Sequence, residues 1–599
     1  MLQNPDVVSG LWPAQPPNGD GSTAHLIKSL FIHISEMDLL EILTFWVLVT
    51  LGACLATSWP ASVTQRQALD CSLNYFTGIA PAGIKIERVQ HVITGFFVET
   101  GNIGYPTFPT GLPELCAVIV NNVTANYRFG MFLPDDWNAK FLAIGSYSFL
   151  GGINWLEMGV GVKYGGVALS TDTGHSSGAG DITWANTTQK QVNWAYQALQ
   201  GSIALGKILT ESYYEQSITY SYYSGCSTGG RQGLKQIQID PDSFDGVLIG
   251  APAWDTKHLM PWLTKLATWN LPEGAPYSIN DSALFARLQA EVIKQCDSLD
   301  GIKDNIVSSP SLCRQEFDIS QIRCDISTNK NKTACWSRAQ TDTALKIYAD
   351  YYTSDGEQLV YKGAEYGSEG EWGVFLLPAV AGDDSQNVRR NFDAQYERYF
   401  MEYGEKWQTT AYNDSVVADA ETRDERIVRS SADQFDISAY RKKGGKVIMY
   451  GGLADNTVPV QHTTYYYNRT SAAMGGNISD FFLYFQIPGM RHCWGTADNV
   501  RAPWMIGSAG QSVQRPPYAS AWSVPLGLSD ARHDALLALM AWVETGRAVD
   551  SIVASEFNFT DATMQNIVVY RQRPLCPYPK TARWDGEGDQ DDAASWSCG

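Results

Sequence analysis

Basic residues are scarce in this sequence of 599 residues, which has 44 lysines and arginines against 63 aspartates and glutamates. The formal net charge of -19 excludes the basic face that nucleic-acid binding requires, and it disfavours an anionic membrane surface as a partner. Hydrophobic residues make up 44% of the chain, which is enough for a large core. The length fits several domains, or one α/β core with insertions.

An apolar run of full membrane-spanning length is also missing. The uninterrupted part of the run Leu39–Ala56 has about 15 residues, fewer than the ~20 that a transmembrane helix needs. Small residues follow it, as in a signal peptide, although no basic n-region stands at Met37. We expect residues 1–58 to be a leader with a signal peptide, and a membrane anchor is the alternative. Either one places the rest of the chain outside the cytosol.

Cysteine usage agrees with export. Of the eleven cysteines, Cys54 lies in the apolar run, so ten remain, an even number that suits an oxidised secreted protein. N-x-S/T sequons, which are supportive only, occur at Asn122, Asn186, Asn280, Asn331, Asn413, Asn468, Asn477 and Asn558.

A G-x-S-x-G pattern stands at Gly225–Gly229 and centres on Ser227. The segment Ile218–Tyr223 alternates β-forming residues and predicts a strand, and helix-forming residues follow from Gly230 to Gln238. Strand, glycine-flanked serine and helix in this order are typical of a nucleophile elbow, which lifts the serine Oγ above a sheet. A glycine-rich turn without a catalytic role is the alternative.

Short β runs alternate with helical stretches along the chain, which predicts a mostly parallel sheet. A helix is expected at 191–209, and a closing helix, Asp534–Thr545, should end at Gly546 as a left-handed cap. The alternation stops at about Trp254 and resumes near residue 435. We therefore expect a catalytic domain from residues 59–253 and 435–599, with residues 254–434 inserted. The strands are expected at 117–120, 141–145, 166–169, 218–223, 246–250, 446–450 and 482–487.

Histidine is rare, and only His258, His462, His492 and His533 follow Ser227. A serine nucleophile needs a base and the base needs an orienting acid, in the chain order Ser, acid, His when the fold is an α/β-hydrolase. His492 follows an expected strand and is the best candidate for the base. Asp455 follows another strand and is the candidate acid, although it could instead cap the turn before Pro459.

Two other residues bear on this assignment. His175 precedes the serine, so it is out of order for a base and is interpreted as structural or pocket-lining. Cys226 precedes Ser227 and Cys493 follows His492. A disulfide between them would close a loop of about 270 residues, would stabilise the fold by roughly 5 kcal/mol, and would hold nucleophile and base together.

These motifs together resemble the tannase/feruloyl esterase family of secreted, mainly fungal esterases. The resemblance is carried by Ser224–Gly233, Gly452–Asp455 and Gly489–Cys493, with further blocks at Thr171–His175 and Asp245–Ala253. It extends from about Cys71 to the C-terminus. It implies an α/β-hydrolase fold with a large lid domain inserted between the serine and the aspartate, and a catalytic triad of Ser227, Asp455 and His492.

One segment departs from the family. The oxyanion hole needs a backbone N–H from Thr228 and a second from an early βα loop, where the family usually has an Asn-Gly-Gly-like sequence. This chain has Gly145–Ser148 there, with Tyr147 at a position where glycine is usual. The Tyr147 N–H is our candidate for the second donor.

A cluster of carboxylates lies in the insertion, between Cys296 and Ile306. Its spacing alone favours a solvated acidic turn. The family resemblance instead implies a structural Ca²⁺ site in the lid, because hard oxygen ligands select this ion. Its ligands would be the side chains of Asp297, Asp300 and Asp304 and the carbonyl groups of Ile302 and Ile306. The resemblance and closeness in sequence also imply the disulfides Cys296–Cys313, Cys324–Cys335, Cys71–Cys116 and Cys576–Cys598.

The resemblance predicts a secreted serine esterase that acts on esters of phenolic acids. The substrate would be a galloyl ester, or a feruloyl or coumaroyl ester on plant cell-wall polysaccharide. Three alternatives stay open: an esterase for other aromatic esters, a membrane-tethered esterase, and a calcium-stabilised secreted binding protein with an inactive triad. No nucleic-acid partner is expected.

Overall fold

The computed structural model describes residues 69–93, 95–272, 274–326, 334–376, 394–497, 500–512, 529–558 and 568–599. The residues Leu69–Gly599 form one compact unit. The expected leader and its apolar run lie outside the described residues, as do Asn331 and the side chain of Asn558. None of the described helices is both long enough and apolar enough to cross a membrane.

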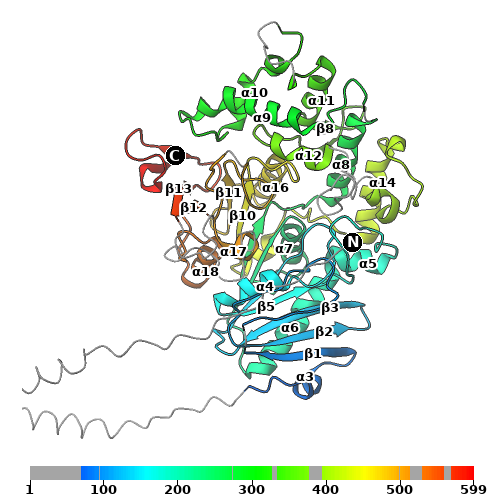
Figure 1. Cartoon of the computed structure of the whole chain (residues 1–599). Coiled ribbons are helices and arrows are strands. Elements are labelled where there is room, and N and C mark those ends of the chain that lie inside the picture. The colour runs from blue at the N-terminus through cyan, green and yellow to red at the C-terminus, as the bar shows by residue number, and fades with distance from the viewer. Residues whose placement is uncertain are drawn as a thin grey trace, which may run out of the picture. The chain divides into compact units, whose positions relative to one another are not determined.

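A sheet of nine strands, in the order β1-β2-β3-β5-β4-β6-β7-β10-β11, is the centre of this unit (Figure 1). The pairs β1/β2, β2/β3 and β3/β5 are antiparallel, and all pairs from β5 to β11 are parallel. The strand bounds are β1 Ile84–Val92, β2 Leu115–Asn122, β3 Tyr127–Pro134, β4 Lys140–Ile144, β5 Val167–Thr171, β6 Tyr220–Cys226, β7 Gly246–Gly250, β10 Lys446–Gly452 and β11 Phe482–Ile487. The prediction of a mostly parallel sheet is confirmed.

Helices cover both faces of the sheet because successive side chains of each strand point to opposite sides. In β10, Val447 and Met449 pack in one apolar core with α6, α7 and α16, whereas Ile448 and Tyr450 pack in the other with α4 and α18. The helix bounds are α3 Leu73–Ile79, α4 Trp155–Gly161, α5 Thr188–Val192, α6 Ala198–Tyr214, α7 Thr228–Ile239, α15 Ser438–Lys442, α16 Val460–Ala473, α17 Ser508–Ser512 and α18 Ala535–Thr545. Gly546 caps α18 in the left-handed region, as expected.

The segment between β7 and β10 is mainly helical, although these two strands are direct neighbours in the sheet. Its helices lie together on one side of the sheet (Figure 1). They share an apolar core that includes Trp262, Leu288 and Trp372. Its elements are α8 Thr256–Asn270, α9 Ser282–Cys296, η4 Asp297–Asp300, α10 Pro310–Glu316, η5 Ile319–Ile322, α11 Arg338–Tyr348, β8 Tyr351–Tyr352, β9 Leu359–Tyr361, η7 Glu369–Glu371, α12 Gly373–Leu376 and α14 Ser415–Arg423. We call residues 254–434 the lid, and its exact boundaries stay a prediction.

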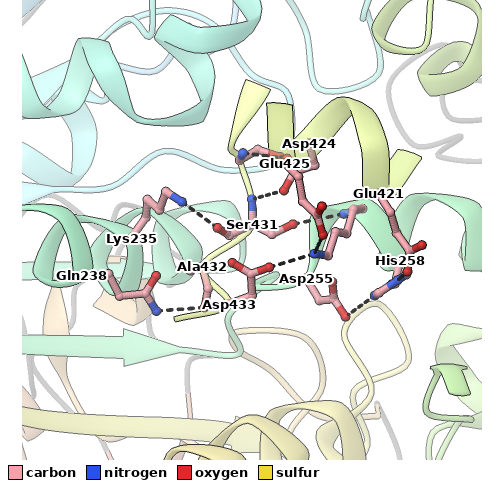
Figure 2. A network of polar contacts seen from close by, with 12 residues as sticks. Lys235, Gln238, Asp255, His258, Glu421, Asp424, Glu425, Ser431, Ala432 and Asp433 are labelled. Atoms are coloured by element: carbon pink, nitrogen blue, oxygen red, sulfur yellow. Dashed lines mark hydrogen bonds and ion pairs between the residues drawn. The ribbon is translucent and has the colours of Figure 1, made fainter. Parts of the chain in front are cut away.

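The return of the lid to the sheet is fixed by polar contacts with α7 (Figure 2). Lys235 Nζ donates to the carbonyl of Ser431 at 2.9 Å, and Gln238 Nε2 donates to the carbonyl of Ala432 at 2.9 Å. Lys257 Nζ of α8 binds Asp433 Oδ2 at 2.8 Å. Since α7 begins directly after Ser227, the lid is attached to the helix that follows this serine.

The chain after α18 forms two small sheets and docks on the sheet edge at β11. The hairpin β12/β13 is followed by the pair β14/β15, and Tyr578 N–H donates to the Tyr484 carbonyl of β11 at 2.7 Å. The bounds are β12 Ile552–Asn558, β13 Val568–Leu575, β14 Ala582–Trp584 and β15 Trp596–Cys598. The structure contains all five predicted disulfides: Cys71–Cys116, Cys226–Cys493, Cys296–Cys313, Cys324–Cys335 and Cys576–Cys598.

Candidate active site

Ser227 occupies the sharp turn between β6 and α7 and has the backbone angles φ 61° and ψ -122°. This left-handed conformation is strained for a residue with a Cβ and is characteristic of the elbow. A Cβ on Gly225 would lie 2.8 Å from the Gly229 carbonyl carbon, and one on Gly229 would lie 2.9 Å from the Ser146 oxygen. Glycine is therefore required at both positions. The structure has the strand, serine and helix arrangement that the sequence predicts.

Asp455 and His492 come from the loops after β10 and β11 and meet through a hydrogen bond of 2.8 Å between Oδ2 and Nδ1. The other oxygen, Oδ1, accepts the N–H groups of Thr457 and Val458, each at 2.9 Å. Burial would lower the pKa of His492, but the charge and hydrogen bond of Asp455 outweigh burial, and the pKa is raised. The pair is therefore arranged to stabilise an imidazolium ion.

Ser227 and His492 line the same cavity, which has a volume of about 470 Å³. The Cys226–Cys493 disulfide joins the residues beside them, with Cα atoms 6.0 Å apart. Among the described residues, no hydrogen bond of 3.5 Å or less joins Ser227 Oγ to His492 Nε2. Such bonds are often longer in the absence of substrate.

The cavity wall is mainly apolar and is built by both the sheet loops and the lid. Helix α8 of the lid contributes Leu259, Met260 and Leu263, which the sequence alone did not identify. From the other side, Tyr147 and Trp494 line the cavity and pack edge to face, with ring centroids 5.4 Å apart. A cavity of this size and polarity fits a small aromatic ligand.

The predicted oxyanion donors differ in their availability. Thr228 is the first residue of α7, where a backbone N–H has no partner within the helix and faces anions favourably. The Tyr147 N–H, in contrast, donates to the Tyr105 hydroxyl oxygen at 2.9 Å. The neighbouring Ser146 N–H donates to Gln232 Oε1 at 3.0 Å. In this conformation the Tyr147 N–H therefore already has a hydrogen-bond acceptor, the hydroxyl of Tyr105, and Tyr105 itself lines the cavity.

Four other histidines make their contacts outside the cavity that contains Ser227. His258 and His462 both bind Asp255, at 2.8 and 3.2 Å, and His533 binds Asp530 at 2.9 Å. His175 Nε2 contacts the Phe149 carbonyl at 3.1 Å, and burial lowers its pKa to about 4. None of these four imidazoles lines the cavity that contains Ser227. The interpretation of His175 as a structural residue agrees with its contacts.

A lid carboxylate that the sequence analysis missed lies behind the Asp455–His492 pair. Glu371, at the end of η7, accepts the His492 N–H on Oε1 at 3.3 Å and the Asn456 N–H on Oε2 at 3.1 Å. Burial raises the pKa of Glu371 to about 7, and the charge of Asp455 adds to the rise. One side chain thus links the acid loop and the base loop. No sequence motif marks it, because it reaches them only through tertiary packing.

The carboxylate cluster of the lid forms a tight loop after α9. Asp297 Oδ1 accepts the N–H groups of Asp304 and Ile306 at 3.0 and 3.2 Å. Asp300 Oδ1 accepts the Ile302 N–H at 3.0 Å, and Asp304 Oδ1 accepts the Ile306 N–H at 3.0 Å. Burial and the charge of Asp304 raise the pKa values of Asp297 and Asp300. The loop therefore concentrates oxygen ligands and negative charge that favour a hard cation.

The side-chain oxygens of the three loop aspartates are spread apart. Among the described residues, only His91, Glu114 and Asp135 bring three possible ligand atoms within 4.8 Å of one another, and the loop aspartates do not. Asp304 Oδ2 forms an ion pair with Arg573 of β13. The donor chemistry thus fits Ca²⁺, while an arginine already balances one of the three carboxylates.

The predicted glycosylation sites are mostly accessible. Asn186, Asn280, Asn413, Asn468 and Asn477 are exposed. Asn122 is half-buried, and its amide donates to the Tyr127 hydroxyl at 3.0 Å. Five of the eight sequons therefore present a free surface for a glycan.

Comparison with known proteins gives a consistent result. A family profile described as tannase and feruloyl esterase matches residues 116–599. A probable feruloyl esterase B-1 of Aspergillus oryzae is 30% identical over 487 residues, which are 80% of this chain and 83% of that protein. A probable feruloyl esterase B-1 of Aspergillus fumigatus is 31% identical over 493 residues, which are 81% of this chain and 86% of that protein.

Two solved structures align over most of this chain. The crystal structure of feruloyl esterase B from Aspergillus oryzae aligns with a TM-score of 0.76 and 26% identity, over 88% of this chain and 99% of that chain. Tannin acyl hydrolase from Aspergillus niger aligns with a TM-score of 0.66 and 19% identity, over 88% of this chain and 95% of that chain. This second likeness concerns the fold alone.

Proposed function

The chain belongs to the tannase and feruloyl esterase family and is a carboxylic ester hydrolase, and we propose that it cleaves esters of phenolic acids by a serine mechanism. The observation that carries the proposal is the common cavity of Ser227 and His492, with His492 bound to Asp455 at 2.8 Å. The apolar wall of this cavity suits an aromatic acyl group.

In the proposed mechanism, Ser227 Oγ attacks the ester carbonyl while His492 takes its proton. Asp455 holds the imidazole in place and stabilises the imidazolium. The Thr228 N–H at the start of α7 donates to the oxyanion. His492 then returns the proton to the departing alcohol, which leaves an acyl-enzyme on Ser227. A water molecule, deprotonated by His492, releases the phenolic acid and restores the serine.

The feruloyl esterase names of the relatives support a feruloyl or coumaroyl ester as the first candidate substrate. A galloyl ester is the second candidate, and its support is the family description, which includes tannase. We further propose that the protein acts outside the cytosol, because five disulfides form and persist in an oxidising compartment.

Hydrolysis of methyl ferulate and methyl gallate, measured side by side, tests this proposal. We expect turnover of at least one ester, and a loss of at least about 10³-fold in kcat for Ser227→Ala, since the nucleophile is removed. Ser217→Ala, which changes an exposed serine, is the matched control and should behave as the wild type. Activity that survives in Ser227→Ala would refute the mechanism. Failure of the wild-type protein on these esters and on generic aryl esters would favour a binding protein with an inactive triad.

A further inference from the structure

A second cavity lies between the C-terminal segment, the lid and the edge of the main sheet. Its volume is about 490 Å³, and it shares no lining residue with the cavity of Ser227. The segment from β13 to β15 forms most of the wall, and the Cys576–Cys598 disulfide fixes the two ends of that segment to each other. The size is typical of a site for a small ligand.

Aromatic rings form one side of this C-terminal cavity. Trp584 and Trp596 are directly opposite each other in the β14/β15 pair, and both line the cavity together with Tyr578. Opposite residues in an antiparallel pair point to the same face. The hairpin therefore presents two neighbouring indole rings to the cavity, which is a surface on which a flat ring or a sugar ring can stack.

The charged groups of the wall are mainly positive. Arg573, Lys580 and Arg583 line the cavity, against a single acidic side chain, Asp300. Arg573 is only 5% exposed, and its guanidinium lies over the Trp596 ring at 4.3 Å. One end of this guanidinium pairs with Asp304. Among the described residues, Lys580 and Arg583 at the rim have no acidic side chain as an ion-pair partner.

Two buried donors in this wall lack an acceptor. Among the described residues, neither the Trp584 Nε1–H nor the Arg573 Nε–H has a hydrogen-bond partner. A buried donor without an acceptor costs about 1–3 kcal/mol, so such groups are normally met by water or by a ligand. An acceptor-rich ligand that reaches both groups would replace water at the two positions.

We propose that the C-terminal cavity is a second binding site, separate from the ester-cleaving site, for a ring that carries a carboxylate. The ring stacks on Trp584, and the carboxylate accepts hydrogen bonds from Arg573 and the rim cations. Two sources have this chemistry: a uronic acid unit of a polysaccharide, and a free phenolic acid. The site recognises its ligand without any covalent step, so it does not depend on the proposed esterase mechanism.

Titration calorimetry on the full chain tests the proposal with three probes: digalacturonate, ferulate and neutral xylobiose. We expect one or both carboxylated probes to bind, and xylobiose to bind at least about tenfold more weakly. Digalacturonate binding would identify the source as a polysaccharide, and ferulate binding alone would identify it as a phenolic acid. Because ferulate can also enter the cavity of Ser227, its binding counts only where variants of the C-terminal cavity weaken it.

Two variants locate the binding. Trp584→Ala removes a stacking surface, and Arg583→Ala removes an exposed rim cation. Each should weaken binding of the carboxylated probe about tenfold and leave kcat on a small methyl ester unchanged. Arg547→Ala, at an exposed arginine outside the cavity, is the matched control. Absence of binding, equal binding of xylobiose, or binding that Arg583→Ala and Trp584→Ala leave unchanged would overturn the proposal.

Discussion

At the scale of the residue, Asp455 makes two kinds of contact at once. Its Oδ1 accepts the N–H groups of Thr457 and Val458, as a turn-capping aspartate does, while Oδ2 accepts from His492. The sequence left a turn cap and an orienting acid as alternatives, and these contacts fit the turn cap together with the proposed role as orienting acid. The turn contacts prevent rotation of the carboxylate, so Oδ2 stays directed at the imidazole.

Glu371 should act on the same imidazole from the lid side. In Glu371→Gln the amide keeps one oxygen but directs an NH₂ group at one of two backbone donors, so one hydrogen bond is lost. A loss of about 1–2 kcal/mol in positioning corresponds to a fall in kcat of about tenfold, with KM little changed. Because the charge of Glu371 helps to raise the pKa of His492, its removal should move the acidic limb of the kcat/KM profile to lower pH.

Glu369→Gln is the matched control for this prediction. Glu369 is a buried carboxylate of the same η7 turn that binds the Tyr348 hydroxyl and the Gly367 N–H, and it has no contact with the triad. Its loss should lower the melting temperature but leave the acidic limb in place. If the acidic limb does not move in Glu371→Gln, the role of Glu371 is structural only.

At the scale of the element, the loop after α9 is where the cation prediction can be decided. Asp304 repels both Asp297 and Asp300, and Arg573, which pairs with Asp304, offsets this negative charge only in part. If Ca²⁺ binds, it stabilises the folded state by about 2.7 kcal/mol at a hundredfold excess over its dissociation constant. We expect the purified protein to contain calcium by elemental analysis, and chelation with EGTA to lower its melting temperature.

Variants of the loop separate specific binding from a general effect of EGTA. Asp297→Asn should lose the bound calcium and melt at the EGTA temperature with or without chelator. Asp342→Asn, on the exposed side of α11, removes the same charge outside the loop and should keep the metal. A protein without calcium whose melting is insensitive to EGTA would mean that Arg573 and the backbone N–H groups hold the loop alone.

The elements also show what a sequence can predict here. The residues of the proposed triad could be selected from the sequence because each lies in the turn or loop after a strand with a recognisable β pattern, and because so few histidines compete. The helix expected at 191–209 is instead a longer helical run, α5 to α6, with a π-helical turn at Asn193–Gln197. Tyr105 and Glu371 were not predictable, because an irregular loop and a lid turn reach the site only through packing over long sequence separations.

At the scale of the whole molecule, ion pairs join the beginning of the lid to its end, close to where the lid meets the sheet domain. His258 of α8 lies between Asp255, where the lid begins, and Glu421 of α14, with contacts of 2.8 and 2.7 Å (Figure 2). The same Asp255 binds His462 of α16. Burial alone would lower the pKa of His258, but Asp255 and Glu421 raise it to about 9. His258 is therefore charged across the physiological range.

This raised pKa predicts how the stability of the lid depends on pH. An unfolded histidine has a pKa of about 6.5, so the ion pairs of His258 stabilise the fold fully below this pH and lose their effect as the pH rises toward 9. Their contribution is at most on the order of 3 kcal/mol. The melting temperature of His258→Asn should lie furthest below that of the wild type near pH 6, and the difference should shrink steadily toward pH 9.5.

His91→Asn is the control, since His91 also lies beside two carboxylates but is 42% exposed, where such pairs contribute little. A deficit of His258→Asn that stays constant or grows with pH would show that packing, and not charge, holds the lid at this position.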